Sequence, residues 1–233
     1  MRLTDTDGMS EMRYQVTNPA TGMLTLGTKT VYDPAVRSDQ SMLQSAQKAR
    51  EEAFGRYKAD PSSTSFNVTQ DGITFRTYIN FDSRTGDPYV GNVHPVNRDF
   101  VGEDYFHDAF GGFFPNSDEH AAAKFALNAL AMDGRIEDLV QLLTEGDPVG
   151  ALGGEPSWQL DRRDDDNTAT GYANWPREAK YCTWVDPNAY RLEWPWRFYG
   201  RAEFHHLVRA LLDAYLARNP HEAEQVAKVA ALL

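Results

Sequence analysis

The sequence predicts an α+β protein, a single domain of residues 1–233 in which a small antiparallel sheet packs with pairs of helices. Three observations lead to this class. A hairpin pattern lies near residues 66–81, amphipathic helix patterns fill much of the remaining chain, and no internal repeat or linker divides it. Residues 1–11 are polar and are expected to form a flexible tail.

The first half of the chain carries the strand signals. Apolar residues alternate weakly over 14–26 around a turn sequence and predict two short strands. A helix is expected over about 38–57, with Ser38 as its cap, because small and apolar residues recur there every three or four positions. The strongest signal is Asp71-Gly72 between two alternating runs, since this dipeptide favours the positive φ angles of a tight hairpin turn.

The middle of the chain predicts two antiparallel helices. Asn116, followed three residues later by Glu119, resembles a capping box at the start of the first helix. Asp133-Gly134 is expected to end this helix, because glycine adopts the left-handed cap conformation. Residues 136–143 then form the apolar stripe of the second helix.

The last third combines an irregular segment with clear helices. Residues 146–200 are expected to be mostly loop, with short strands at 181–184 and 190–194. A nearly continuous apolar stripe predicts a helix over 204–215, and Pro220 is suited to open a final helix.

The composition is that of an ordinary globular protein, 41% hydrophobic and 12% aromatic, which excludes a collagen-like or wholly disordered chain. The single cysteine, Cys182, excludes an intramolecular disulfide and a zinc site built on several thiolates. No apolar run approaches the ~20 residues that span a bilayer, and the N-terminus lacks a secretory leader. We therefore expect a cytoplasmic protein without membrane contact. No phosphate-binding glycine motif is present, so no cofactor is expected.

The negative charge is concentrated in one stretch. The chain carries 34 acidic and 23 basic residues, a net charge of −11. Residues 99–166 hold sixteen of the acids and four of the bases, a net charge of −12, whereas the remainder is +1. Folded into one face, such a stretch repels phosphate backbones and attracts a basic partner, so a basic protein is the expected partner and nucleic acid is not. The alternative is an acidic surface that serves only solubility.

All five tryptophans lie within residues 158–196, close to the acidic run 164–166. Tryptophan and tyrosine dominate interface hot spots, so this segment is a candidate recognition surface. The alternative is a core layer beneath the C-terminal helix. The candidate binding residues are Asp164, Asp165, Asp166, Tyr172, Trp175 and Trp184.

The acidic run does not have the pattern of a calcium-binding loop. Counted from Asp161 or from Asp164, neither the glycine at the sixth position nor the glutamate at the twelfth is present, so no metal site is assigned. Cys182 lies in a predicted strand without a nearby base and is expected to be buried and unreactive.

One histidine has neighbours suited to catalysis. His107 lies between Asp104 and Asp108, and a carboxylate is able to orient it as a general base. No nucleophile accompanies it, and no two histidines have the His-Xaa3-His spacing of a helical metal site, so no catalytic residue is assigned.

These observations favour a non-enzymatic acidic protein that binds another protein. The most concrete version is an immunity- or inhibitor-type protein that neutralises a basic enzyme such as a nuclease toxin. Two alternatives remain open, and with them the question of enzymatic activity. One is a hydrolase or metal-dependent enzyme that uses His107 with Asp104 and Asp108, and the other is a glycan-binding module that uses the tryptophans.

Overall fold

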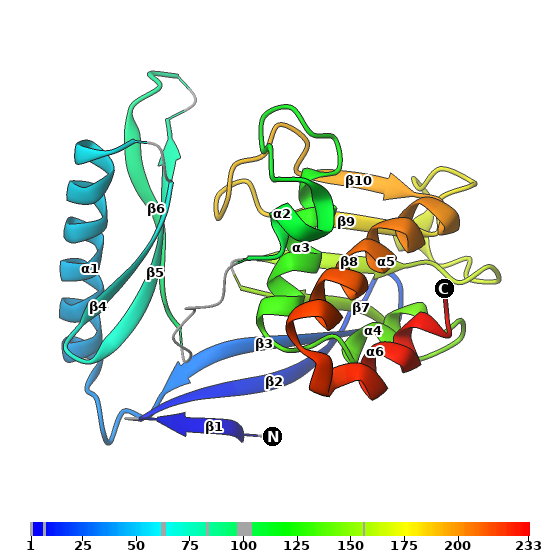
Figure 1. Ribbon diagram of the computed structural model, residues 1–233, viewed down its shortest axis with the longest axis horizontal. Coiled ribbons are helices and arrows are strands. Elements are labelled where there is room, and N and C mark those ends of the chain that lie inside the picture. The colour runs from blue at the N-terminus through cyan, green and yellow to red at the C-terminus, as the bar shows by residue number, and fades with distance from the viewer. Residues whose placement is uncertain (1, 7, 62–63, 83, 97–103, 156) are drawn as a thin grey trace. The chain divides into compact units, whose positions relative to one another are not determined.

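The structure is a computed structural model that describes residues 2–6, 8–61, 64–82, 84–96, 104–155 and 157–233. It mixes helices with β-sheets, as the α+β class predicts (Figure 1). The chain divides into two compact units. Unit 1 comprises Met1–Arg13, Thr28–Gly102 and Pro187–Arg191, and unit 2 comprises Tyr14–Gly27, Glu103–Asp186 and Leu192–Leu233.

The described strands form two sheets, one of them larger than the small sheet that the sequence predicts. The seven-stranded sheet has the order β1-β2-β3-β7-β8-β9-β10, and the three-stranded sheet has the order β4-β5-β6. The strands are β1 Arg2–Thr6, β2 Met9–Thr17, β3 Leu24–Tyr32, β4 Ser65–Gln70, β5 Ile73–Phe81, β6 Pro88–Val96, β7 Val149–Gly154, β8 Trp158–Arg162, β9 Tyr181–Val185 and β10 Trp196–Tyr199. The segment 1–11, for which the sequence suggests a flexible tail, contains β1 and the start of β2.

The described helices lie mainly in unit 2, where α2 to α6 are found. Unit 1 contains α1 Asp39–Ala59. The helices of unit 2 are α2 Phe106–Phe110, α3 Ala121–Met132, α4 Asp138–Leu143, α5 Arg201–Arg218 and α6 Ala223–Ala230. None of the described helices is long and apolar enough to cross a membrane.

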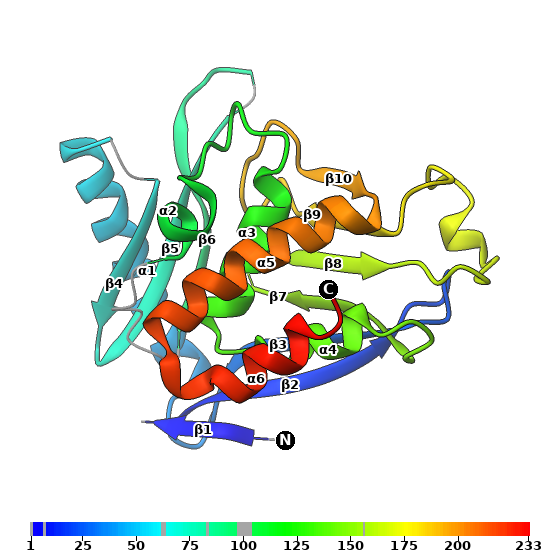
Figure 2. The ribbon, with the colours of Figure 1, turned by 45° about the vertical axis from the view of Figure 1, so that its right-hand side comes forward.

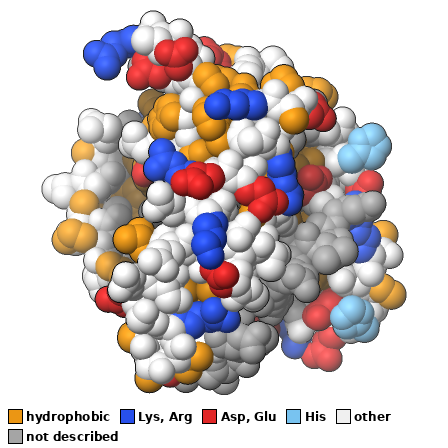
Figure 3. Space-filling view, turned by 90° about the vertical axis from the view of Figure 1, so that its left-hand side faces the viewer, with side chains coloured by type: hydrophobic (Ala, Val, Ile, Leu, Met, Phe, Trp, Pro, Cys, Tyr) orange, Lys and Arg blue, Asp and Glu red, His pale blue; other side chains and the backbone are white. Residues whose placement is uncertain are grey.

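Unit 1 places α1 on one face of the β4-β5-β6 sheet. Ser38 caps the helix as predicted, because its side chain accepts a hydrogen bond from the Ser41 backbone N–H at 3.2 Å. The apolar side of α1 buries Ala49 and Ala53 against the sheet, in one core cluster with Phe75. Figure 3 shows side chains of both charge signs interspersed on the face that it displays.

The hairpin between β4 and β5 is confirmed. Asp71 and Gly72 both adopt positive φ angles, 51° and 79°, and the flanking strands pair antiparallel from Gln70↔Ile73 to Ser65↔Tyr78. The turn residues Asp71 and Gly72 therefore determine the register of the β4–β5 hairpin. The pairing of β5 with β6 is separate, and its register shifts after Tyr78.

In unit 2, helices cover one face of the strands β7 to β10. Both ribbon views show α3 and α5 across this face (Figures 1 and 2). The buried side of α3 consists mostly of alanines. Ala122, Ala126 and Leu130 are completely buried. The alanines allow the helix to approach the sheet closely. Tyr181, Thr183 and Val185 of β9 are buried on the same side, and α3 contacts β9.

Three sequence-based boundaries are wrong in unit 2. The first middle helix begins at Ala121, and Asn116 lies in the turn before it without acting as the cap. A strand is expected at 190–194, but the strand of this region is β10, which begins two residues later at Trp196. The expected loop that starts at 146 contains the strands β7 and β8.

Candidate functional site

The open face of the unit 2 sheet carries the candidate site. Side chains alternate between the two faces of a strand, so the positions between the buried ones project away from α3. Trp184 of β9 is the register partner of Trp196 of β10, and these indoles are 38% and 55% exposed. Two neighbouring indoles on one sheet face form an apolar contact surface open to solvent.

An aromatic row continues from this pair along the edge of the sheet. The ring centroid of Trp196 lies 5.3 Å from that of Phe198, which lies 5.1 Å from Trp175. Trp175 in turn contacts Tyr172 edge-to-face at 5.0 Å. The Arg163 guanidinium lies over the Trp175 ring at 5.7 Å. The structure thus brings together three of the predicted aromatic site residues, Tyr172 and Trp175 within the row and Trp184 beside it.

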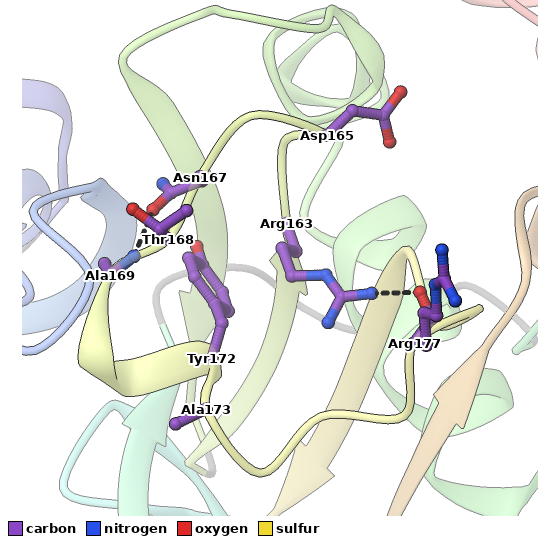
Figure 4. Close-up of a pocket in the computed structure, with 8 residues that line it drawn as sticks. All are labelled: Arg163, Asp165, Asn167, Thr168, Ala169, Tyr172, Ala173 and Arg177. Atoms are coloured by element: carbon purple, nitrogen blue, oxygen red, sulfur yellow. Dashed lines mark hydrogen bonds between the residues drawn. The ribbon is translucent and has the colours of Figure 1, made fainter.

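A pocket of about 290 Å³ lies in the loop that supplies Tyr172. Its lining combines two arginines, one carboxylate, two uncharged polar side chains, two alanines and a tyrosine: Arg163, Asp165, Asn167, Thr168, Ala169, Tyr172, Ala173 and Arg177. Figure 4 shows the Arg163 side chain in a hydrogen bond with the Arg177 carbonyl, which it reaches at 2.7 Å. Arg163 also donates to the carbonyls of Pro176 and Ala179, so it fixes the shape of the loop.

Two of the three predicted acidic site residues are held in ion pairs. Asp164 accepts a hydrogen bond from Arg162 Nε at 2.6 Å. Asp165 accepts one from Lys180 Nζ at 2.7 Å, and this bond lowers the pKa of the Asp165 carboxyl. Asp166 is exposed. The acidic run therefore offers a partner less free charge than its sequence suggests.

Ion pairing also extends along the wider acidic stretch 99–166. Besides Asp164 and Asp165, five of its carboxylates pair with cations: Asp108 with Arg218, Asp118 with Lys124, Glu119 with Arg197, Asp138 with Arg135, and Glu145 with Lys180 and Arg201. The stretch is thus not a row of uncompensated carboxylates. By sequence, unit 2 still carries 22 acidic and 11 basic residues, so the whole net charge of −11 belongs to this unit and unit 1 is neutral.

A partly buried carboxyl that the sequence analysis did not single out as a site residue lies on the same sheet face as Phe198 of the aromatic row. Asp161 of β8 is the register partner of Cys182, which is the partner of Phe198. Burial raises the pKa of Asp161 to about 6, against a hydrogen bond from Gln159 Nε2 at 2.6 Å that favours the charged form. Burial, aided by the Asp161 charge, raises the pKa of the Cys182 thiol to about 12. The sequence shows Asp161 only as the first residue of an acidic run, and the pairing of β8 with β9 is what places it beside Cys182.

The structure gives the candidate base His107 no enclosed site. His107 is exposed on α2, and Asp108 pairs with Arg218. The Asp104 carboxylate accepts a hydrogen bond from the Phe106 backbone N–H. Within the described residues, no group of three or more histidine, cysteine or acidic side chains is arranged to hold a metal ion.

Comparison with known proteins adds one relationship. No protein-family model matches the chain. A stretch of 99 residues is similar to an RNA-cleaving enzyme. This enzyme is the tRNA nuclease CdiA of Yersinia mollaretii, which is 37% identical over the stretch. The alignment covers 40% of this chain and 3% of the nuclease, so the chain spans only a small part of the length of that protein.

Proposed function

We propose that the chain acts in a nuclease-toxin system and that unit 2 is its immunity-type module, which binds and neutralises a basic nuclease. The observation that carries this proposal is the exposed pair Trp184 and Trp196 on a unit with a net charge of −11. The similarity of part of the chain to a tRNA nuclease supports the toxin context.

The charge of unit 2 suits a nuclease as partner. A nuclease presents positive charge to the phosphates of its substrate, and a negatively charged protein is attracted to the same surface. Long-range attraction raises the association rate, whereas contact energy is concentrated in a few buried aromatic anchors. Because ion pairs occupy many carboxylates of unit 2, we assign the contact energy to Trp184 and Trp196, with Trp175 beside them.

The direct test measures binding of catalytically inactive tRNA nuclease CdiA to the full chain. Trp184→Ala and Trp196→Ala are each expected to raise the dissociation constant by about 30-fold, the loss of about 2 kcal/mol that defines a hot spot. Leu43→Ala removes an apolar side chain that is 70% exposed on α1 of unit 1, and should leave the affinity unchanged. Absence of binding, or equal binding by all three variants, contradicts the proposal.

A second measurement tests the electrostatic attraction between unit 2 and the nuclease. The association rate is expected to fall by about tenfold between low and physiological ionic strength, because salt screens the attraction between oppositely charged surfaces. A rate that does not change with salt excludes steering by unit 2. Oligosaccharide binding that Trp184→Ala and Trp196→Ala abolish would favour the glycan-binding alternative.

A further inference from the structure

The sheet face of unit 2 that carries the exposed indoles also carries one carboxyl. Six side chains occupy this face of β8, β9 and β10 in two rows of register partners: Trp196, Trp184 and Gln159 in one row, and Phe198, Cys182 and Asp161 in the other. The helices α3 and α5 cover the opposite face of these strands (Figures 1 and 2). The six-residue patch therefore combines three aromatic side chains with a single acidic group.

Contacts between the two rows hold the patch together. Gln159 Nε2 donates a hydrogen bond to Asp161 Oδ1 at 2.6 Å. At the other end of the patch, the ring centroid of Trp196 lies 5.3 Å from that of Phe198. Asp161 and Trp184 are diagonal neighbours on paired strands, a relation that corresponds to a separation of about 7–8 Å. One long side chain from a partner is therefore able to contact both the carboxyl and the indole.

Asp161 has no counter-charge of its own. Its hydrogen bond comes from a neutral amide, and no lysine, arginine or histidine among the described residues forms an ion pair with it. Asp164 and Asp165 of the same acidic run, by contrast, are both paired with cations. Partial burial of a carboxylate without a cation reduces stability, and such groups are frequent at functional sites.

We propose that Asp161, together with Trp184 and Phe198, forms a binding site for an arginine side chain of the basic partner. Arginine suits this patch better than lysine, because its planar guanidinium stacks on aromatic rings and also donates paired hydrogen bonds to a carboxylate. Its charge supplies the cation that Asp161 lacks, and its aliphatic stem packs on the rings. The inference rests on the function proposed for unit 2 and names the group that the partner places beside the exposed indoles.

The site should bind its cation only while Asp161 is charged. Burial raises the pKa of this carboxyl to about 6, and a bound cation favours the ionised form. The titratable groups that interact with Asp161 are Cys182 and Tyr172, and burial raises the pKa of each to about 12. Neither group changes its charge between about pH 5 and pH 8, so the charge of the patch in this interval depends on Asp161.

The main experiment compares the affinity of catalytically inactive tRNA nuclease CdiA for the full chain and for Asp161→Asn. The substitution keeps an acceptor for Gln159 and removes only the charge. It should raise the dissociation constant by about 30-fold at pH 8, as expected for breaking a partly buried charge pair. At pH 5 most of Asp161 is already protonated in the wild-type chain, so the effect should fall to about fourfold.

Asp166→Asn is the matched control, because it removes an exposed carboxylate of the same unit. It should change the affinity by less than about twofold at both pH values. Circular dichroism verifies folding, and Asp161→Ser replaces Asp161→Asn if that variant does not fold.

An independent measurement needs no nuclease. N-acetyl-arginine amide, titrated into the full chain at pH 8 and followed by tryptophan fluorescence, should bind with a dissociation constant of roughly 1 mM. N-acetyl-citrulline amide, which has nearly the same shape without the charge, should bind at least about tenfold more weakly. Asp161→Asn should weaken binding of the arginine compound by about tenfold and abolish the difference between the two compounds.

The outcomes separate this inference from the function proposed for unit 2. Nuclease binding that Asp161→Asn leaves unchanged, or weakens equally at both pH values, overturns the inference and does not affect the proposed function. Absence of nuclease binding contradicts the proposed function, and the arginine compound then decides the inference. Equal binding of the arginine and citrulline compounds, or binding of neither, overturns it.

Discussion

The buried side chain of Arg162 donates hydrogen bonds to several backbone carbonyls of unit 2, and its removal gives a sharp test of these contacts. Arg162 is completely buried at the end of β8. Besides its bond to Asp164, its guanidinium donates to the carbonyls of Gln141, Leu142, Asp147 and Val149, at 2.7 to 3.3 Å. Two of these carbonyls belong to the last turn of α4, which has no further helical N–H groups to satisfy them. The cation also lies at the negative end of the helix dipole.

The magnitude follows from the groups that Arg162→Ala leaves without partners. Removing one member of a buried ion pair costs about 3–5 kcal/mol, and each buried carbonyl that loses its donor costs about 1–3 kcal/mol. Relaxation and water entry recover part of this sum, so we expect a loss of about 4 kcal/mol. Such a loss is a large part of the 5–15 kcal/mol that stabilises typical proteins.

Urea denaturation followed by tryptophan fluorescence measures this effect, because Trp158 is buried in the same unit. Arg177→Ala is the control, since this arginine is exposed and should change the free energy of unfolding by less than about 0.5 kcal/mol. Asp164→Asn retains the carbonyl bonds of Arg162 and should cost less than half as much as Arg162→Ala. A loss below about 1 kcal/mol for Arg162→Ala would refute the assignment of these hydrogen bonds.

Two further predictions concern Asp161 and Cys182, the partly buried groups on the sheet face that carries Phe198. Asp161 has a native pKa of about 6 and an ordinary value of 3.8, so its burial penalty grows as the pH rises through this interval. Asp161→Asn should therefore raise the free energy of unfolding by about 2 kcal/mol above pH 6 and leave it unchanged below about pH 4, as urea denaturation at both pH values will show. The raised pKa of Cys182 predicts that a disulfide reagent modifies this thiol at pH 8 at least about 100-fold more slowly in the native chain than in urea, and equal rates would contradict its burial.

The sequence predicts those parts of the fold that depend on short segments. The Asp71-Gly72 hairpin and the Ser38 cap form as predicted because each depends on residues within a few positions. The strand β7 escapes prediction because it contains three glycines and pairs with β3, which is distant in sequence, and β8 escapes prediction because it has only five residues. The pairing of His94 with Arg76 also escapes prediction, since only the register between β5 and β6 places these two residues opposite each other.

Counting the charged residues predicts that the net charge of unit 2 is negative, but it does not predict which carboxylates are held in ion pairs. Lys180 lies fifteen residues from Asp165 and thirty-five from Glu145, and only the fold brings these charges together. Ion pairing removes individual carboxylates from direct contact with a partner. It does not remove the net charge of −11, which acts at distances up to the Debye length of about 8 Å at physiological salt. The long-range electrostatic attraction of unit 2 for a partner and its direct contacts with that partner should therefore respond to different perturbations. Salt should change the association rate of a basic partner, and truncation of Trp184 or Trp196 should change its dissociation rate.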